Sequence, residues 1–211
     1  ICCVSKSQFG TSLTNVTFDL RQGKILGIGG VAGNGQDELF AVLSGEQFSQ
    51  HGSISLIGIN ITKFNPNQRR KIGFFSAPEE RLGHAAAPNM SLIENTLITA
   101  ENSQNLVSRG FIDWKKSKAF AEKVIKKFDV RTPGSQNTAG SLSGGNLQKF
   151  VIGREILQNP SVFIVNQPTW GVDAAAASSI RQALLTLSEN GAAILVISQD
   201  LDELLEISDQ F

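Results

Sequence analysis

The chain has 211 residues, of which 41% are hydrophobic and 18% are charged, so it can fold around a core. Its 19 basic and 19 acidic residues give a formal net charge of +0. This balance disfavours nucleic acid as the main partner, because phosphate-binding surfaces usually carry a basic excess. Cys2 and Cys3 are adjacent and cannot build a disulfide framework, and no apolar run approaches the ~20 residues that cross a bilayer.

Short apolar runs bounded by turn residues alternate with segments of helical period, which predicts an α/β domain. The predicted strands are 16–20, 24–28, 53–57, 71–75, 162–165 and 193–197. Helical stripes cover 114–128, with Asp113 as N-cap, then 147–154 and 180–187. Residues 82–150 show no obvious strand, so we expect a helical insertion between two halves of a sheet. Its lysines, at 115, 116, 118, 123, 126 and 127, are expected on the solvent face of a helix.

A glycine-rich segment follows the predicted strand 24–28. Gly30 and Gly35 have the spacing of a phosphate loop, with Gly33 between them and an apolar helix behind. In such a loop, glycines let backbone N–H groups turn inward, and the helix N-terminus adds its positive dipole end. A glycine-rich turn without a ligand is the alternative interpretation.

The two positions after these glycines depart from the phosphate-loop pattern. Gln36 stands where the pattern has lysine, and Asp37 stands where it has a serine or threonine. An amide replaces only part of a charge-assisted phosphate contact, which is worth roughly 1.5–3 kcal/mol. Asp37 either repels phosphate or ligates Mg²⁺ with its own carboxylate.

A second motif opens another predicted helix. It consists of Leu142, Ser143, Gly144, Gly145 and Asn146. A serine and two glycines at a helix start present a hydroxyl and backbone N–H groups to an anion; a capped helix start is the alternative. The motif resembles the signature sequence of ABC transport ATPases, in the form found in the second, C-terminal cassette of simple-sugar and nucleoside importers.

Other segments resemble the same family in order and spacing. Residues 162–169 resemble the Walker B strand and its exit, with Asn166 and Gln167 as the polar pair. Asp173 ends a segment that resembles the D-loop, and Gln199 stands at the histidine position of the switch segment. Upstream, Glu79 stands at the glutamine of the Q-loop. Phe9 falls where the family has an adenine-stacking aromatic residue, although a core aromatic would look the same.

The resemblance implies an α/β P-loop NTPase (RecA-like) core sheet with an antiparallel β subdomain and a helical signature subdomain. All 211 residues would form one nucleotide-binding domain, with the core and β subdomain in 1–81 and 150–211 and the helical subdomain in 82–149. It implies ATP and Mg²⁺ as cofactors, with Mg²⁺ at Asp37, Asn166 and Glu79. Besides Phe9, the implied nucleotide-binding residues are Gly30, Gly33, Asn34, Gly35, Gln36, Asp37 and Glu38.

Five family positions are changed together: Gln36, Asp37, Asn166, Gln167 and Gln199. An amide cannot accept a proton at neutral pH, and loss of a general base costs about 10²–10⁴-fold in rate. Asn166 offers a neutral oxygen where a hard dication prefers a carboxylate. We therefore expect this chain's own site to be hydrolysis-deficient, while its intact signature acts in trans on ATP held by a partner cassette.

The chain lacks an initial methionine and a signal-peptide pattern, and it stops abruptly, so we expect a fragment of a longer tandem-cassette polypeptide. The expected partners are another cassette, transmembrane permease subunits near Glu79 and, indirectly, an extracytoplasmic substrate-binding protein. No nucleic acid is expected. The resemblance places the domain at the cytoplasmic face of the inner or plasma membrane, serving uptake of a nucleoside or simple sugar. The alternatives are a soluble ABC protein acting on ribosomes or DNA, and a scaffold cassette without nucleotide.

Overall fold

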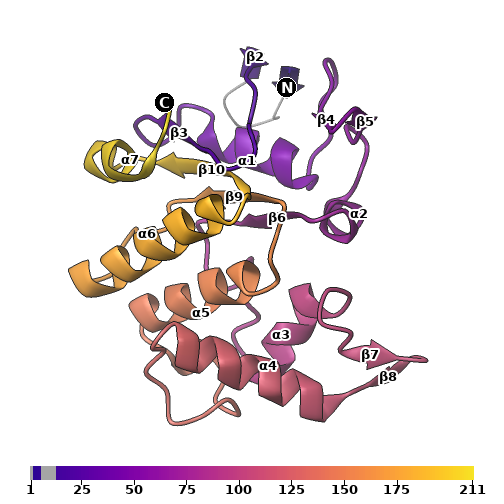
Figure 1. The fold of residues 1–211 in the computed structure, drawn as a ribbon, viewed down its shortest axis with the longest axis vertical. Helices are drawn as coiled ribbons and strands as arrows, with labels where there is room; N and C mark the ends of the chain where they lie inside the picture. Colours follow the sequence, from indigo (N-terminus) through magenta and orange to yellow (C-terminus); the bar gives the residue numbers. More distant parts are fainter. Residues whose placement is uncertain (1, 6–12) are drawn as a thin grey trace. The chain divides into compact units, whose positions relative to one another are not determined.

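The computed structural model describes residues 2–5 and 13–211 (Figure 1). It contains two compact units. The first comprises the described residues up to Ser76 with Ser161–Gln167 and Ser188–Phe211; the second comprises Ala77–Pro160 and Pro168–Leu187. Residues 150–160 and 168–187, which the sequence analysis grouped with the core, therefore cluster with the helices.

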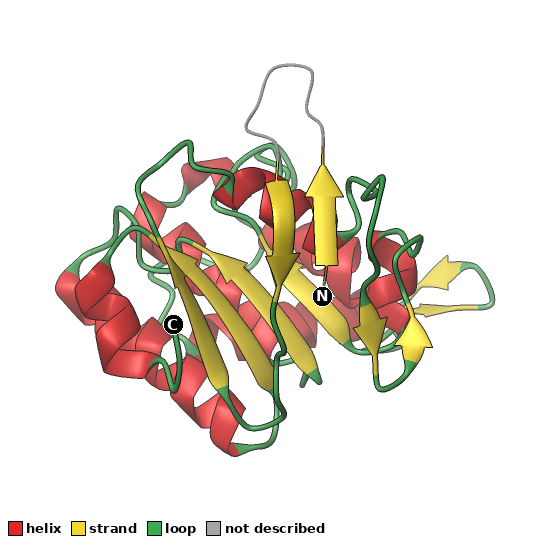
Figure 2. Ribbon diagram, turned by 90° about the horizontal axis from the view of Figure 1, so that it is seen from above, coloured by secondary structure: helices red, strands yellow, loops and turns green. Residues whose placement is uncertain are grey.

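A four-stranded sheet forms the centre of the first unit and confirms the predicted α/β class (Figure 2). Its order is β3 (Ile25–Gly29), β10 (Ala193–Ser198), β9 (Val162–Asn166) and β6 (Phe74–Ala77). Strand β10 pairs in parallel with both β3 and β9, and every residue of β9 and β10 is buried. Burial on both faces explains why these two strands are continuous apolar runs. The carboxyl ends of β3, β10 and β9 therefore meet at one edge of the sheet.

Two helices cover opposite faces of this sheet. Helix α1 (Gln36–Ser44) buries four apolar side chains in a cluster that Leu26 and Ile28 of β3 also contact. Side chains alternate along a strand, so Gly27 and Gly29 face the other side. There, an added Cβ at Gly27 would come within 3.1 Å of Leu204 in α7 (Leu201–Ile207). Glycine in β3 thus permits the close approach of α7.

Antiparallel pairs complete the first unit, and their strands differ in position or length from the predicted ones. Strand β1 (Cys2–Ser5) pairs with β2 (Leu13–Thr17), and β4 (Ser55–Leu56) forms a hairpin with β5 (Ile59–Asn60). The predicted strand 16–20 overlaps β2 only at its first two residues. Of the predicted strand 53–57, only the two residues of β4 form a strand.

The predicted strand 71–75 was wrong at its start. Helix α2 (Pro66–Lys71) extends through Lys71, and β6 begins at Phe74. The helix starts with proline at its first position and with a capping box in which Asn65 and Gln68 satisfy each other's backbone N–H groups. These are strong helix-start signals, and the helix that they begin includes Lys71, which the apolar pattern had assigned to a strand.

The second unit is mainly helical. Its helices are α3 (Leu92–Ala100), α4 (Trp114–Lys127), the 3₁₀ turn η1 (Ala139–Ser141), α5 (Gly144–Ile156) and most of α6 (Ala174–Glu189). Helices α3, α4 and α5 contact one another (Figure 1). Asp113 caps α4 as predicted, accepting a hydrogen bond from the Lys116 N–H, and the six lysines of α4 are exposed. Among the described residues, no helix combines the length and apolar character required to span a membrane.

Two expectations for the second unit were wrong. A small hairpin of β7 (Val107–Ser108) and β8 (Phe111–Ile112) lies in the region where we expected no strand. Its two-residue turn, Arg109 and Gly110, has φ values of 50° and 82°, which is typical of tight hairpins. Trp114 is 53% exposed, because the buried stripe of α4 begins one turn later at Ser117.

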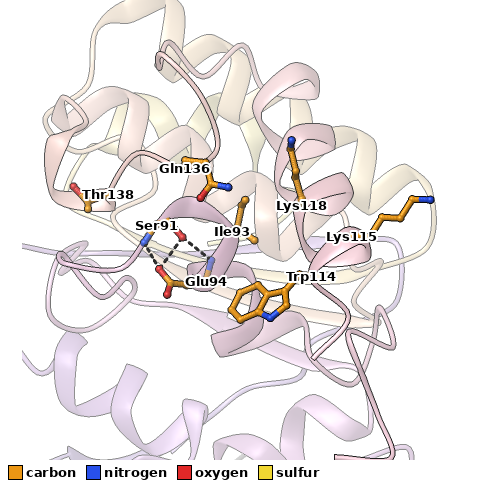
Figure 3. Close-up of a pocket in the computed structure, with 8 residues that line it drawn as sticks. All are labelled: Ser91, Ile93, Glu94, Trp114, Lys115, Lys118, Gln136 and Thr138. Carbon is orange, nitrogen blue, oxygen red and sulfur yellow. Dashed lines mark hydrogen bonds between the residues drawn. The ribbon is translucent and has the colours of Figure 1, made fainter. Parts of the chain in front are cut away.

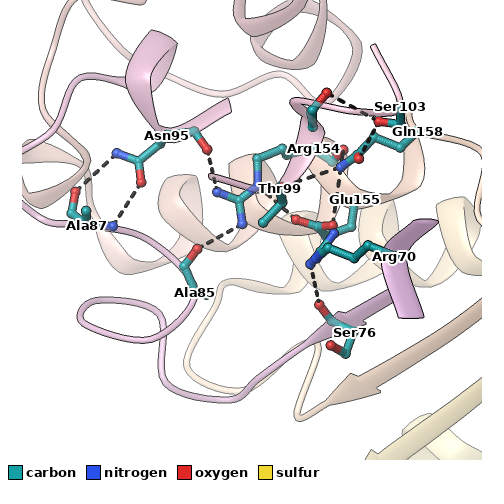
Figure 4. A network of polar contacts seen from close by, with 11 residues as sticks. Arg70, Ser76, Ala85, Ala87, Asn95, Thr99, Ser103, Arg154, Glu155 and Gln158 are labelled. Atoms are coloured by element: carbon teal, nitrogen blue, oxygen red, sulfur yellow. Dashed lines mark hydrogen bonds and ion pairs between the residues drawn. The ribbon is translucent and has the colours of Figure 1, made fainter. Parts of the chain in front are cut away.

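A buried ion pair anchors α5 (Figure 4). The side chains of Arg154 and Glu155 are 2% and 1% exposed, and Nε of Arg154 donates to Oε1 of Glu155 over 2.9 Å. The guanidinium also donates to the carbonyl oxygens of Asn95 and Ala85, at 2.9 Å and 2.8 Å. One side chain therefore binds α5 to α3 and to the segment that precedes it.

Replacing Arg154 with methionine should lower the free energy of unfolding by about 3–5 kcal/mol, because Glu155 would keep its buried charge without this partner. The control is Lys118→Met, which removes the exposed Lys118–Glu122 pair, whose atoms are 3.7 Å apart, and should cost about 0.5 kcal/mol or less. Urea unfolding followed by circular dichroism measures both. Equal effects would contradict an anchoring role for Arg154.

Candidate functional site

The predicted phosphate loop connects β3 to α1 in the first unit. Gly33 and Gly35 have φ values of 83° and 101°, a backbone region that residues with a Cβ enter only under strain. Gly35 is the N-cap of α1, and no side chain caps this helix start. The loop thus has the backbone form that the sequence predicted, with helix N–H groups that no side-chain cap satisfies.

The side chain of Gln36 turns back across this loop. Its Oε1 accepts a hydrogen bond from the backbone N–H of Asn34 at 3.0 Å, and its Nε2 donates to the carbonyl of Val31 at 2.8 Å. An added Cβ at Gly30 would lie only 2.8 Å from this Nε2. The amide therefore uses an N–H group that a phosphate oxygen would need, so a phosphate that bound there would first have to displace it.

Asp37 and Asn166 contact each other directly. Nδ2 of Asn166, at the end of β9, donates to the Asp37 carboxylate at 3.0 Å. Asn166 is 2% exposed, and its Oδ1 has no hydrogen-bond partner within the described part of the chain. Within that part, Asp37 also belongs to no cluster of three His, Cys, Asp or Glu side chains that could hold a metal ion.

Mg²⁺ requires a near-octahedral set of oxygen ligands. Here an amide nitrogen, rather than an oxygen, faces the Asp37 carboxylate. This arrangement of the pair does not fit Mg²⁺, and a hydrogen bond occupies the position that the resemblance gave to the metal.

Gln167 and Gln199, at the family's general-base and switch positions, are joined by one hydrogen bond between a side chain and the backbone. Gln167 is 3% exposed and has φ of 52°, an uncommon conformation for a residue with a side chain. Its Oε1 accepts from the backbone N–H of Gln199 at 3.2 Å, and its own N–H donates to Ile197. The structure thus brings together two residues that the sequence analysis predicted separately. Glu38 is half-buried in α1, and Phe9 lies outside the described residues.

The signature motif lies in the second unit, at the start of α5. Ser143 is the N-cap, yet its side chain makes no capping bond; its Oγ accepts from Nδ2 of Asn146 at 2.8 Å. Oδ1 of Asn146 in turn accepts from the backbone N–H of Arg131 at 2.8 Å. Gly144 is exposed, Gly145 is half-buried, and Leu142 is half-buried just before them. The start of α5 is therefore ordered and has no side-chain cap, which suits an anion.

Asp173 lies beside this motif, because an added Cβ at Gly145 would be 3.7 Å from its Oδ2. Its Oδ1 accepts from the Ala176 N–H at 2.9 Å, and this bond holds the pKa of Asp173 below its ordinary value. Glu79 is half-buried. Its negative charge opposes the lowering of the Arg81 pKa by burial in the same unit.

Two residues that join these segments were missed by the sequence analysis. Nε of Arg81 donates to Oε1 of Gln148 at 2.9 Å, and Nε2 of Gln148 donates to the carbonyl of Pro168 at 2.8 Å. Gln148 is 1% exposed. The sequence offered one signal that Gln148 is buried: it follows Leu147, which lies on the buried side of α5.

A cavity of about 640 Å³ lies elsewhere in the second unit (Figure 3). It is lined by Ser91, Ile93, Glu94, Trp114, Lys115, Lys118, Gln136 and Thr138. Ser91 and Glu94 form the capping box of α3, and the hydrogen bond from the Ser91 hydroxyl lowers the pKa of Glu94. The cavity thus combines one indole and two ammonium groups with a carboxylate that is already hydrogen-bonded.

A glycine loop between a parallel strand and a helix, with an uncapped Ser-Gly-Gly helix start in a helical unit, defines a nucleotide-binding cassette fold. A family model described as "ABC transporter" matches residues 13–170. The chain belongs to the ABC transporter family.

Curated relatives include the glucose import ATP-binding protein TsgD13 of Haloferax volcanii, 36% identical over 94% of this chain and 36% of that protein. The nucleoside import ATP-binding protein NupA of Lactococcus lactis is 36% identical over 98% of this chain and 41% of that protein. The arabinose import ATP-binding protein AraG of Vibrio parahaemolyticus is 39% identical over 95% of this chain and 40% of that protein. The chain therefore spans roughly two fifths of the length of these relatives.

Solved structures agree on the fold. A nucleotide-free ATP-binding cassette from an ABC transporter matches with a TM-score of 0.76 and 23% identity, over 99% of this chain and 84% of that one. A dimeric cassette in a post-hydrolysis state, bound to ADP and Pi, matches with a TM-score of 0.76 and 20% identity, over 96% of this chain and 87% of that one.

Restoring a carboxylate with Asn166→Asp should create a cation site, because two carboxylates would then face each other. Without Mg²⁺ their repulsion raises a folded-state pKa above the ordinary carboxyl value of about 4, so the variant should lose stability as pH rises from that value through the raised pKa. Mg²⁺ should raise its melting temperature more than that of the wild type. Differential scanning calorimetry from pH 5 to 8, with and without MgCl₂, measures this, with Asn166→Ala as the control. An equal Mg²⁺ response in the wild type would show that the native pair already holds the ion.

Proposed function

We propose that this chain is the second, C-terminal cassette of an importer ATPase subunit that serves uptake of a nucleoside or simple sugar. Its signature motif completes the ATP site of a partner cassette, while its own loop binds ATP weakly and does not hydrolyse it. The observation that carries the proposal is the contrast between the two sites. Neither helix start has a side-chain cap, but the Gln36 side chain already accepts from an N–H group of the phosphate loop, whereas Ser143 at the start of α5 bonds to the side chain of Asn146.

Three contacts support a hydrolysis-deficient site in this chain. Gln36 engages an N–H group of the loop, Asn166 donates to Asp37, and Gln167 accepts from the backbone of Gln199. None of these three amides can accept a proton from water at neutral pH. The polar groups of the degenerate site thus serve internal hydrogen bonds.

The start of α5 supports a role in trans. Helix α5 has 13 residues, and its dipole and first N–H groups favour an anion such as a terminal phosphate. The names of relatives refer to import of glucose, nucleosides and arabinose, and one similar structure is dimeric. The greater length of these relatives agrees with a further cassette in the same polypeptide.

Permease subunits are the proposed membrane partners, docking near Glu79 and the helical unit. The exposed Phe111, Ile112 and Trp114, together with the cavity at α3 and α4, support a docking surface there. The domain would then lie at the cytoplasmic face of the membrane, and an extracytoplasmic binding protein would act on it only through the permeases.

Ser143 provides the sharpest test of the trans role. Asp and Asn are equally good N-caps and have nearly the same size, so Ser143→Asp and Ser143→Asn differ mainly in charge. The Asp variant should hydrolyse ATP at least about tenfold more slowly, because a carboxylate at the start of α5 repels the partner's terminal phosphate. The measurement is phosphate release by the full-length polypeptide assembled with its permeases in liposomes.

Gln199→Ala is the companion test of this chain's own site. Its side chain stands at the switch position, and its removal should change the rate less than about twofold if this site contributes no turnover. Equal rates in the two Ser143 variants would overturn the trans role. A tenfold loss in Gln199→Ala would show that this chain's own site is active.

A further inference from the structure

Arg81 lies where three segments of the second unit meet. Its Nε donates to Gln148 of α5 at 2.9 Å, and its Nη2 donates to the carbonyl of Trp170. An added Cβ at Gly144 would lie 2.9 Å from its Nη1, and one at Gly171 would lie 3.5 Å from its Nη2. One guanidinium thus contacts both the signature helix and the segment that follows β9. The residue that carries it, Arg81, lies close to Glu79 in the chain.

Gln148 extends the same network. It is 1% exposed, accepts from Arg81 and donates through Nε2 to the carbonyl of Pro168 at 2.8 Å. Trp170 and Pro168 belong to one short segment that leads to Asp173, which lies beside Gly145. The start of α5 is therefore bound to this segment at two points, both through the Arg81–Gln148 pair.

The charge and shape of the arginine suit this position. A guanidinium is planar, stays protonated at neutral pH and donates in fixed directions to more than one acceptor. Burial lowers the pKa of Arg81. The negative charge of Glu79 acts in the opposite direction, so the guanidinium has an opposite charge nearby in the same chain segment. A lysine has a single ammonium and cannot reproduce this fork.

We infer that Arg81 is a positioning residue that fixes the signature motif against the 168–173 segment and links both to the segment bearing Glu79. The inference rests on the proposed trans function of the signature. A displacement of residues 79–81 would be passed to Gly144 and to the carbonyl of Trp170 through one rigid side chain. The positions of the N–H groups that meet the partner's phosphate would then depend on Arg81.

The test compares Arg81→Met, Gln148→Met and the double variant in the full-length polypeptide assembled with its permeases. Arg81→Met should lower kcat for ATP about 10- to 100-fold, because small misplacements of a positioned group carry that cost. KM should change less than about threefold, because Arg81 does not bind the nucleotide. The double variant should lose little more than Arg81→Met, since both residues act in one network.

Hydrogen exchange provides a second readout. In Arg81→Met, amide exchange should rise in peptides covering 141–150 and 167–174, while peptides covering β3 and β10 stay unchanged. Arg81→Lys serves if the methionine variant fails to assemble, and the same loss of kcat is expected. Wild-type kcat in Arg81→Lys, or additive losses in the double variant, would overturn the inference. If Ser143→Asp is impaired while Arg81→Met is not, this inference fails alone; equal rates in the two Ser143 variants would remove the proposed function itself.

Discussion

The position of the signature motif depends on the buried guanidinium of Arg154. Helix α5 carries the motif at its first turn and Arg154 in its last, and that side chain bonds to Glu155 and to two carbonyls of the 85–95 segment. Buried charges are stable only when every donor finds an acceptor, so this arrangement tolerates little displacement. A helix fixed at one end by such a network can hold an exposed, uncapped N-terminus at the other.

The changes at the phosphate loop are linked by physical contacts. The Gln36 side chain bonds to the loop itself, and Asp37 on α1 accepts from Asn166 at the end of β9. The side chain of Gln167 accepts from the backbone N–H of Gln199. The side chains of Gln36, Asn166 and Gln167 thus each form a hydrogen bond within the fold. This pattern is expected of a site retained for its structure.

The phosphate loop and the start of α5 have different physical requirements. The loop of the first unit needs a cation and a base to turn over ATP, and its side chains provide amides and one carboxylate. The start of α5 in the second unit needs only backbone N–H groups and a correct position. Arg81 and Gln148 bond the first turns of α5 to the carbonyls of Trp170 and Pro168, while Arg154 anchors its last turn. These requirements support the proposed division of labour between partner cassettes.

The sequence alone determined the α/β class, the strands β3, β9 and β10, the glycine loop and the signature, because these depend on local patterns and spacing. Short-range rules that were overlooked explain the errors at Lys71 and at the β7–β8 hairpin, where capping and turn residues decided the structure. Only the tertiary structure decided that Gln36 folds into its own loop, that Asn166 turns its nitrogen toward Asp37 and that Arg81 reaches Trp170. Side-chain direction and partners distant in sequence are set by packing, which no local pattern encodes.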